Sequence, residues 1–141
     1  YLHVKNWRNK MAYSKEAVFA RSDSVGEHND CTVKALALTT RHSYDSAHAI
    51  LTKAGRKKGR GPSWYQWRAA FPMAGYHLLD VTHKIKAKTI TTLEKEGLPR
   101  LHCYVVEVRG HVVAIRGGKV LDWTQGRRHR INRVLRVVKN P

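Results

Sequence analysis

The sequence predicts a single α+β domain in which helices come first along the chain and an antiparallel β-sheet follows. Between residues 31 and 73, apolar residues recur at helical spacing and serines stand where helix N-caps are needed. From residue 76 onward the chain is rich in β-branched residues, and a Gly-Gly pair separates two apolar runs. Helices and strands segregated in this way are typical of α+β architecture and not of a doubly wound parallel sheet.

Serine caps and apolar stripes place three helices in the first half of the domain. Residues 31–40 form a buried helix, because apolar side chains at helical spacing cover one face and its borders. Ser43 is a good N-cap for a second helix over 44–54, and the glycine that follows ends it. Ser63 caps a third helix within 62–71, which a proline and a glycine close.

The chain before these helices has a different character. Residues 1–27 are polar, basic and only weakly periodic, although Ser14 is suited to cap a short helix within them. We therefore expect a basic N-terminal arm over 1–27 that lies on a domain made of residues 28–141. A chain of 141 residues is long enough for one such domain to bury a core without added cross-links.

Strands dominate the second half of the chain. Residues 76–82 and 101–108 are apolar and β-rich, and residues 111–123 contain the Gly-Gly pair between two apolar runs, which predicts a hairpin. Residues 88–97 favour a short helix, although their threonines and isoleucine also suit a strand. Residues 130–139 fit a final strand with arginines toward solvent, or a basic helix.

The charge of the chain is its strongest global feature. Lys and Arg number 27 against 10 Asp and Glu, so the formal net charge is +17. Such an excess predicts contact with a polyanion such as DNA or RNA, because attraction to phosphates does not depend on base sequence. The alternative is a basic protein whose charge only keeps it in solution.

Two basic segments are the candidate nucleic-acid contacts. The loop GRKKGRG at 55–61 alternates glycines with cations, and residues 127–139 contain six Arg or Lys without an acid. Near the loop, Trp64 and Trp67 stand among cations and are able to stack on bases, but their spacing also suits a helix core. The predicted contacts are Arg56, Lys57, Lys58, Arg60, Arg127, Arg128, Arg130 and Arg133.

The remaining composition argues against several classes of protein. Two cysteines are too few for a disulfide framework or a cysteine-only zinc site, and the histidines lack metal-ligand spacing, so we expect no metal and no cofactor. No apolar run reaches the length of about eighteen residues that a membrane span needs, and the N-terminal segment lacks the apolar core of a signal peptide. We expect a protein of the cytoplasm or of a virion.

Cys31 is the first candidate for chemistry, because it stands at the start of the helix predicted for 31–40. Helix N-termini stabilise anions, and the thiolate is the reactive form of cysteine. Asp30, just before it, is expected to cap that helix. Cys103 lies inside an apolar strand and is expected to be structural. A nucleophilic thiol also needs a base and a group that orients the base.

The hairpin predicted for 111–123 supplies both groups. If Gly117 and Gly118 form a two-residue turn, His111 and Asp122 become diagonal neighbours on one face of the hairpin. A three-residue loop would place the two side chains on opposite faces. Asp122 stands in an apolar stretch, where an acid usually has a partner, and the alternative partner is one of the nearby arginines.

The order of these residues resembles the papain-like cysteine peptidases in a compact form. The stretch NDCTVKALALTTRHSYDSAHAILTKAGRKKGRG is similar to the opening of small phage and bacterial proteins of that superfamily, and GHVVAIRGGKVLDW is similar to their His–Asp hairpin. The resemblance covers most of residues 28–125. It implies a papain-like fold in which a cysteine-bearing helix packs on an antiparallel sheet.

The same resemblance implies a reaction. Cys31 attacks the carbonyl carbon of a peptide, isopeptide or other amide bond, His111 handles the proton, and Asp122 fixes the histidine tautomer. The backbone N–H of Cys31 and the side chain of Asn29 would bind the oxyanion. Better-known members carry a glutamine several residues before the cysteine, and this chain has Val25 at that spacing.

Two alternatives stay open. The departure at the oxyanion position allows a non-catalytic papain-like scaffold in a basic, nucleic-acid-associated virion or host-takeover protein. A ribonuclease that uses His111 and His28 as acid and base is the other alternative. The hypotheses separate because a thiol hydrolase requires Cys31, whereas a nucleic-acid binder requires its arginines and weakens steeply with salt.

Overall fold

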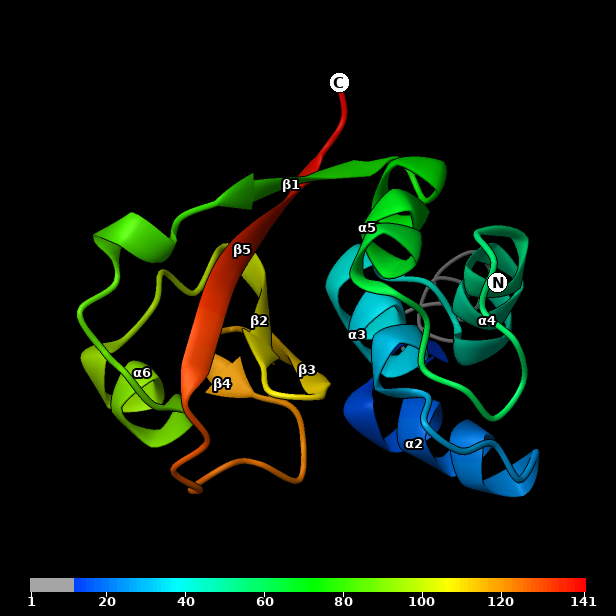
Figure 1. The fold of residues 1–141 in the computed structure, drawn as a ribbon, viewed down its shortest axis with the longest axis horizontal. Helices are drawn as coiled ribbons and strands as arrows, with labels where there is room; N and C mark the ends of the chain where they lie inside the picture. The colour runs from blue at the N-terminus through cyan, green and yellow to red at the C-terminus, as the bar shows by residue number, and fades with distance from the viewer. Residues whose placement is uncertain (1–11) are drawn as a thin grey trace, which may run out of the picture.

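The computed structural model describes residues 12–141 and contains a five-stranded antiparallel β-sheet with helices on both faces (Figure 1). The order across the sheet is β1–β5–β2–β3–β4, so β5, β2 and β3 are interior strands. The strands are β1 (Tyr76–Asp80), β2 (Cys103–Val108), β3 (His111–Arg116), β4 (Lys119–Val120) and β5 (Ile131–Lys139). The α+β class predicted from the sequence is confirmed.

Four helices of the described region pack on one face of the sheet, and one short α-helix covers the other (Figure 1). The first group is α2 (Lys15–Ser24), α3 (Cys31–Thr40), α4 (Tyr44–Lys53) and α5 (Trp64–Met73). The opposite face carries η1 (Thr82–Lys84) and α6 (Ile90–Glu96), so residues 88–97 contain a helix and not a strand. None of the helices within residues 12–141 combines the length and the apolar character that crossing a bilayer demands.

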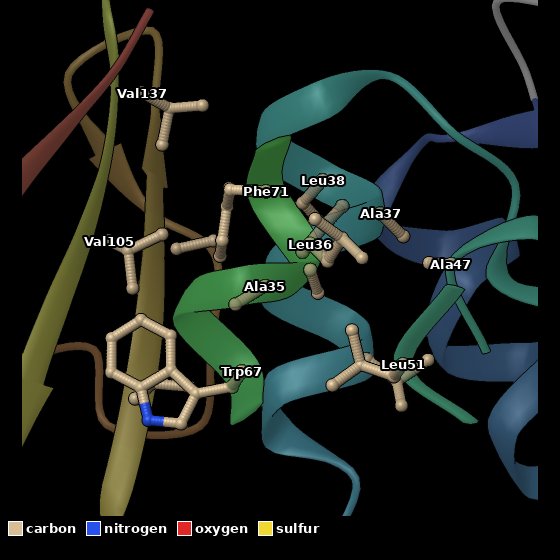
Figure 2. Packing of buried hydrophobic residues seen from close by; sticks show 14 of the residues in the cluster. Ala35, Leu36, Ala37, Leu38, Ala47, Leu51, Trp67, Phe71, Val105 and Val137 are labelled. Carbon is tan, nitrogen blue, oxygen red and sulfur yellow. The ribbon is translucent and has the colours of Figure 1, made fainter. Parts of the chain in front are cut away.

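Two hydrophobic cores hold these layers together. The larger core lies between the helix group and the sheet, and Figure 2 shows Phe71 of α5 reaching toward Val105 of β2, with Leu36 deeper among the helices. The smaller core lies on the other face, where Ile90 and Leu93 of α6 are fully buried. Burial of each such side chain stabilises the fold by about 1.5–3 kcal/mol. Because α3 packs directly on β3, the start of that helix comes close to the sheet.

Helix α2, which lies within the arm expected over 1–27, packs in this core. Val18 of α2 has no exposed surface and packs in the larger core, and Ser14 caps the helix by accepting a hydrogen bond from the backbone N–H of Ala17 at 3.1 Å. The sequence pattern did not predict the burial of α2, because Val18 is its only buried aliphatic residue and one residue gives no helical periodicity of apolar side chains. Residues 1–11 of that arm lie outside the described residues.

The hairpin has the register that the Gly-Gly turn predicts. Arg116 of β3 pairs with Lys119 of β4, which leaves Gly117 and Gly118 as the turn, with φ of 63° and 77°. Two positive φ values are what a type I′ hairpin turn needs, and glycine adopts them without steric cost. Residues 130–139 form a strand because both β1 and β2 hydrogen-bond to β5, which excludes the helix alternative for this segment.

Candidate active site

Cys31 is the first residue of α3, and its partly buried side chain lies near the start of β3. The residue lines two clefts, of about 410 and about 560 Å³, and His111 lines both of them as well. The helix begins where the sequence predicted, so the unpaired N–H groups of its first turn lie beside the cysteine. These N–H groups are suited to stabilise negative charge that develops beside them during a reaction.

His111 is hydrogen-bonded to Asp122, with 2.8 Å between Nε2 and Oδ2. His111 begins β3 and Asp122 follows the end of β4, so the two-residue turn brings them together as expected. Asp122 is only 6% exposed, and it also accepts hydrogen bonds from the backbone N–H and the hydroxyl of Thr124, at 3.2 and 2.9 Å. Within residues 12–141 no arginine forms an ion pair with Asp122.

The contacts of His111 favour its protonated form. Burial of the ring opposes the charge, but the hydrogen bonds to Asp122 and Cys31 and the negative charge on both partners outweigh burial, and the pKa of His111 rises to about 9. The pKa of Asp122 is lowered, since its bonds to His111 and Thr124 outweigh its burial. Because Nε2 faces Asp122, Nδ1 is the ring nitrogen left for the thiol. A thiol, an imidazole and a carboxylate thus follow one another, which is the order of groups that thiol catalysis uses.

Trp123 is a member of this site that sequence reasoning missed. Its ring centroid lies 5.1 Å from that of His111 and 5.2 Å from that of His129. The side chain is 54% exposed, lines the larger cleft and packs beside the His111 ring. The available signal was a tryptophan directly after Asp122, but the direction in which its ring turns depends on the tertiary fold.

Asn29 lines the larger cleft beside Cys31, but its amide is partly committed elsewhere. Its Nδ2 donates a hydrogen bond to the carbonyl of Gly59 at 2.9 Å, which ties the residue to the basic loop. The backbone of Asn29 has φ of 50°, in the left-handed region that asparagine tolerates better than most residues. One N–H of the amide is left over for an oxyanion, so Asn29 stays a candidate for that role.

Asp30 does not cap α3 with its side chain, so that expectation is wrong. Its carboxylate turns away from the helix end and accepts hydrogen bonds from the hydroxyls of Ser22 and Tyr44, at 2.5 and 2.8 Å. Lys34 completes the cluster at 3.1 Å. Although burial opposes ionisation, these bonds hold the pKa of Asp30 below its usual value. With the carboxylate engaged there, the first N–H groups of α3 are not occupied by Asp30.

Arg56 was predicted to contact nucleic acid, and the structure excludes it from the surface. The residue is 2% exposed, and its Nη1 lies 3.2 Å from Oε2 of the buried Glu27. Its Nη2 donates to the carbonyls of His28 and Asn29, at 3.0 and 3.4 Å. A buried guanidinium needs a buried carboxylate, and the partner here comes from 29 residues earlier in the chain. Arg56 therefore holds the turn that precedes Cys31.

The other predicted contacts are on the surface: Lys57, Lys58, Arg60, Arg127, Arg128, Arg130 and Arg133 are all exposed. Two of the arginines stack on exposed tryptophans. The guanidinium of Arg127 lies 5.5 Å from the Trp123 ring, and that of Arg133 lies 5.9 Å from the Trp64 ring. Trp64 lines the smaller cleft and Trp123 the larger, so both stacks border the clefts at Cys31.

Trp64 and Trp67 have different roles despite their helical spacing. Trp67 is 4% exposed and packs in the larger core, as core spacing predicts. Trp64 is 52% exposed, and Arg68 lies 4.9 Å from its ring. Of these two tryptophans, only Trp64 is therefore exposed enough to stack on a base.

Cys103 lies in β2, away from the clefts that Cys31 lines. Burial raises the pKa of its thiol, although Arg116 and Arg41 oppose that rise. Both cysteines are free thiols. Among the described residues, no group of three or more His, Cys, Asp and Glu side chains is arranged to hold a metal ion.

Fold and site together define an α+β domain that carries a Cys–His–Asp arrangement where its main helix meets the sheet. Comparison of the chain with models of known protein families, with curated proteins and with solved structures finds no match. A function for this domain therefore has to be argued from the geometry of its own residues.

Proposed function

We propose that the protein is a thiol-dependent hydrolase of papain-like arrangement that cleaves a peptide, isopeptide or other amide bond. One observation carries the proposal: His111 lies 2.8 Å from Asp122 and lines both clefts together with Cys31, close enough to the thiol for the pKa of its imidazole to rise. A histidine used only in packing has no need of both a buried carboxylate and a thiol.

The reaction follows from the order of the groups. The Cys31 sulfur, as thiolate, forms a bond to the carbonyl carbon, and the protonated His111 ring then gives its proton to the departing amine. The product at this stage is a thioester on Cys31. His111, now neutral, takes a proton from water, and the resulting hydroxide equivalent replaces the sulfur and releases the acid. Asp122 stabilises the imidazolium in both halves of the cycle.

The start of α3 is suited to hold the oxyanion of the tetrahedral intermediate. The backbone N–H of Cys31 lies at the positive end of the helix, where its N–H groups have no intrahelical partner. The N–H of the Asn29 amide that Gly59 does not use would be the second donor. This assignment replaces the upstream glutamine of better-known papain-like proteins with a residue two positions before the nucleophile.

The rate of iodoacetamide alkylation against pH tests the proposal. We expect Cys31 to react at about pH 6 much faster than Cys103, and His111→Ala to remove at least about tenfold of that rate. Asp122→Asn should have a smaller effect in the same direction. The exposed His77 provides a matched histidine control, and His77→Ala should leave the Cys31 rate unchanged. Equal rates for the two cysteines, unaffected by His111→Ala, would refute the proposal.

A second candidate function is favoured by the two Arg–Trp stacks beside the clefts. Exposed tryptophans between arginines are suited to bind single-stranded nucleic acid, because bases stack on the rings and phosphates attract the cations. The domain would then be a nucleic-acid-associated protein, such as a virion or host-takeover component, with or without thiol chemistry. Both functions are compatible if the charge localises a hydrolase on DNA or RNA.

A further inference from the structure

Glu107 is an acid in the wall of the cleft that Cys31 and His111 share. It lies in β2, one residue before the end of the strand, and lines the cleft of about 410 Å³. Trp64 and Trp67 line the same cleft, and Figure 2 shows Trp67 reaching from α5 toward the sheet. The cleft therefore combines a carboxylate, two indole rings and the proposed nucleophile.

The Glu107 carboxylate lacks a partner in the described part of the protein. Its Oε2 is buried and has no hydrogen-bond donor, and no ion pair involves Glu107 within residues 12–141. This is unexpected in a chain with 27 Lys and Arg. Arg133 is its cross-strand neighbour on β5, yet the guanidinium of Arg133 lies over the Trp64 ring.

Glu107 as a residue is partly exposed, but a buried carboxylate oxygen without a donor is costly, and a binding site is a common reason for such a group. A cationic ligand group would supply the missing partner. The indole rings of the cleft already pack with cations of the protein: Arg68 lies 4.9 Å from the Trp64 ring and 5.7 Å from the Trp67 ring, and Arg133 lies 5.9 Å from the Trp64 ring. These rings therefore suit the stem and the charge of a further long basic side chain at the parts of the rings that these arginines leave open. Arg109 and His111 bring positive charge to the same cleft, but Arg109 is exposed, so water screens it more than it screens Glu107.

We propose that Glu107, with Trp64 and Trp67, forms a subsite for a lysine or arginine side chain of a peptide substrate, next to the bond that Cys31 attacks. This inference rests on the proposed function, since it concerns the substrate of the same cysteine. Glu107 would then determine specificity, by favouring a basic side chain of the substrate in a cleft whose rim is itself basic.

Charged thiol reagents test the subsite without requiring hydrolysis. Methanethiosulfonates transfer an alkylthio group to an accessible thiolate and release methanesulfinate, and they exist with an ammonium or a sulfonate tail. The measured quantity is the ratio of the cationic to the anionic rate at Cys31, divided by the same ratio at Cys103. We expect Glu107→Gln to lower this quotient by about fivefold or more, because it removes the charge and keeps the shape. The exposed Glu16 gives a control, Glu16→Gln, that should leave the quotient unchanged.

The outcomes separate this inference from the proposed function. A quotient that falls in Glu107→Gln supports the subsite even where His111→Ala leaves alkylation unaffected, in which case only the hydrolase proposal fails. A quotient that Glu107→Gln does not change overturns the subsite. If Cys31 reacts with neither reagent, titration with benzamidinium, followed by tryptophan fluorescence, decides: binding that Glu107→Gln weakens about fivefold supports the subsite, and unaltered or absent binding overturns it.

Discussion

The guanidinium of Arg56 lies 3.2 Å from the carboxylate of Glu27, and neither side chain exposes more than 1% of its surface. The same carboxylate accepts hydrogen bonds from the backbone N–H groups of Gly59 and His28, at 2.8 and 3.1 Å, and lies 2.6 Å from His48 Nε2. These hydrogen bonds hold the basic loop at 55–61 against the turn that precedes Cys31. The sequence of this loop is typical of a solvent-exposed segment, yet its own residue Arg56 is buried and holds the loop in place.

Loss of the arginine should therefore destabilise the protein. Arg56→Met leaves Glu27 buried without its cation, and we expect the free energy of unfolding to fall by about 3–5 kcal/mol in urea denaturation. Lys57→Met, at the exposed neighbour, should change it by less than about 0.5 kcal/mol. If Arg56→Met instead kept full stability and weakened nucleic-acid binding, Arg56 would be a surface contact after all.

Acid should weaken the same network. Burial of Glu27 opposes its charge, but hydrogen bonds from Arg56, His48 and the backbone outweigh burial and lower its pKa from 4.5 to about 2. Because the folded pKa is the lower one, Glu27 contributes stability above about pH 4.5 and loses it as the pH falls toward 2. We expect Glu27→Gln to be less stable at neutral pH and to lose less stability than wild type over that acid range. Parallel urea midpoints of the two proteins over this range would contradict the assignment.

The histidine of the site should titrate far from its ordinary range. The pKa of His111 is raised from 6.5 to about 9, so proton NMR of its ring should give a midpoint near 9. Because the folded pKa is the higher one, the pair contributes its full stability below about pH 6.5 and loses it as the pH rises through 9. Asp122→Asn and Cys31→Ser should each lower the midpoint. A wild-type midpoint at or below 6.5 would show that the three groups do not interact.

Nucleic-acid binding, where it occurs, should depend on the arginines of residues 127–133 more than on net charge. Replacement of Arg127, Arg128, Arg130 and Arg133 by glutamine should weaken binding to a single-stranded oligonucleotide and reduce the salt slope by roughly one for each phosphate that the variant no longer neutralises. The matched control removes four exposed lysines of the α6 side, Lys84, Lys86, Lys88 and Lys95. Fluorescence anisotropy over a salt series compares the two. Equal losses would mean that only net charge matters.

Local chemistry explains which parts of this protein could be predicted from the sequence. Ser43 accepts a hydrogen bond from the backbone N–H of Ser46 at 3.1 Å and caps α4, as the sequence predicts. The Gly117–Gly118 turn set the hairpin register and therefore the pairing of His111 with Asp122. Caps and two-residue turns act within a few residues of themselves, so their geometry can be read along the chain.

Tertiary packing decided the rest, because it joins groups whose partners lie far away in the sequence. The meeting of Cys31 with His111 required α3 to pack on β3, although each residue could be nominated from its own element. The burial of Arg56 depended on Glu27, and a cation in a glycine-rich loop gives no local sign of such a partner. The Glu107 carboxylate is unpaired because the side chain of its cross-strand neighbour Arg133 packs on the Trp64 ring, which the residue pattern of β2 does not predict. The sequence alone determined the main helices and strands and the pairing of His111 with Asp122, because the hydrogen bonds of caps and turns join residues that are close in the sequence. The tertiary structure decides which charged side chains are buried, which are paired and which face a cleft. The reason is that segments far apart in the sequence must pack together before water is excluded from these groups.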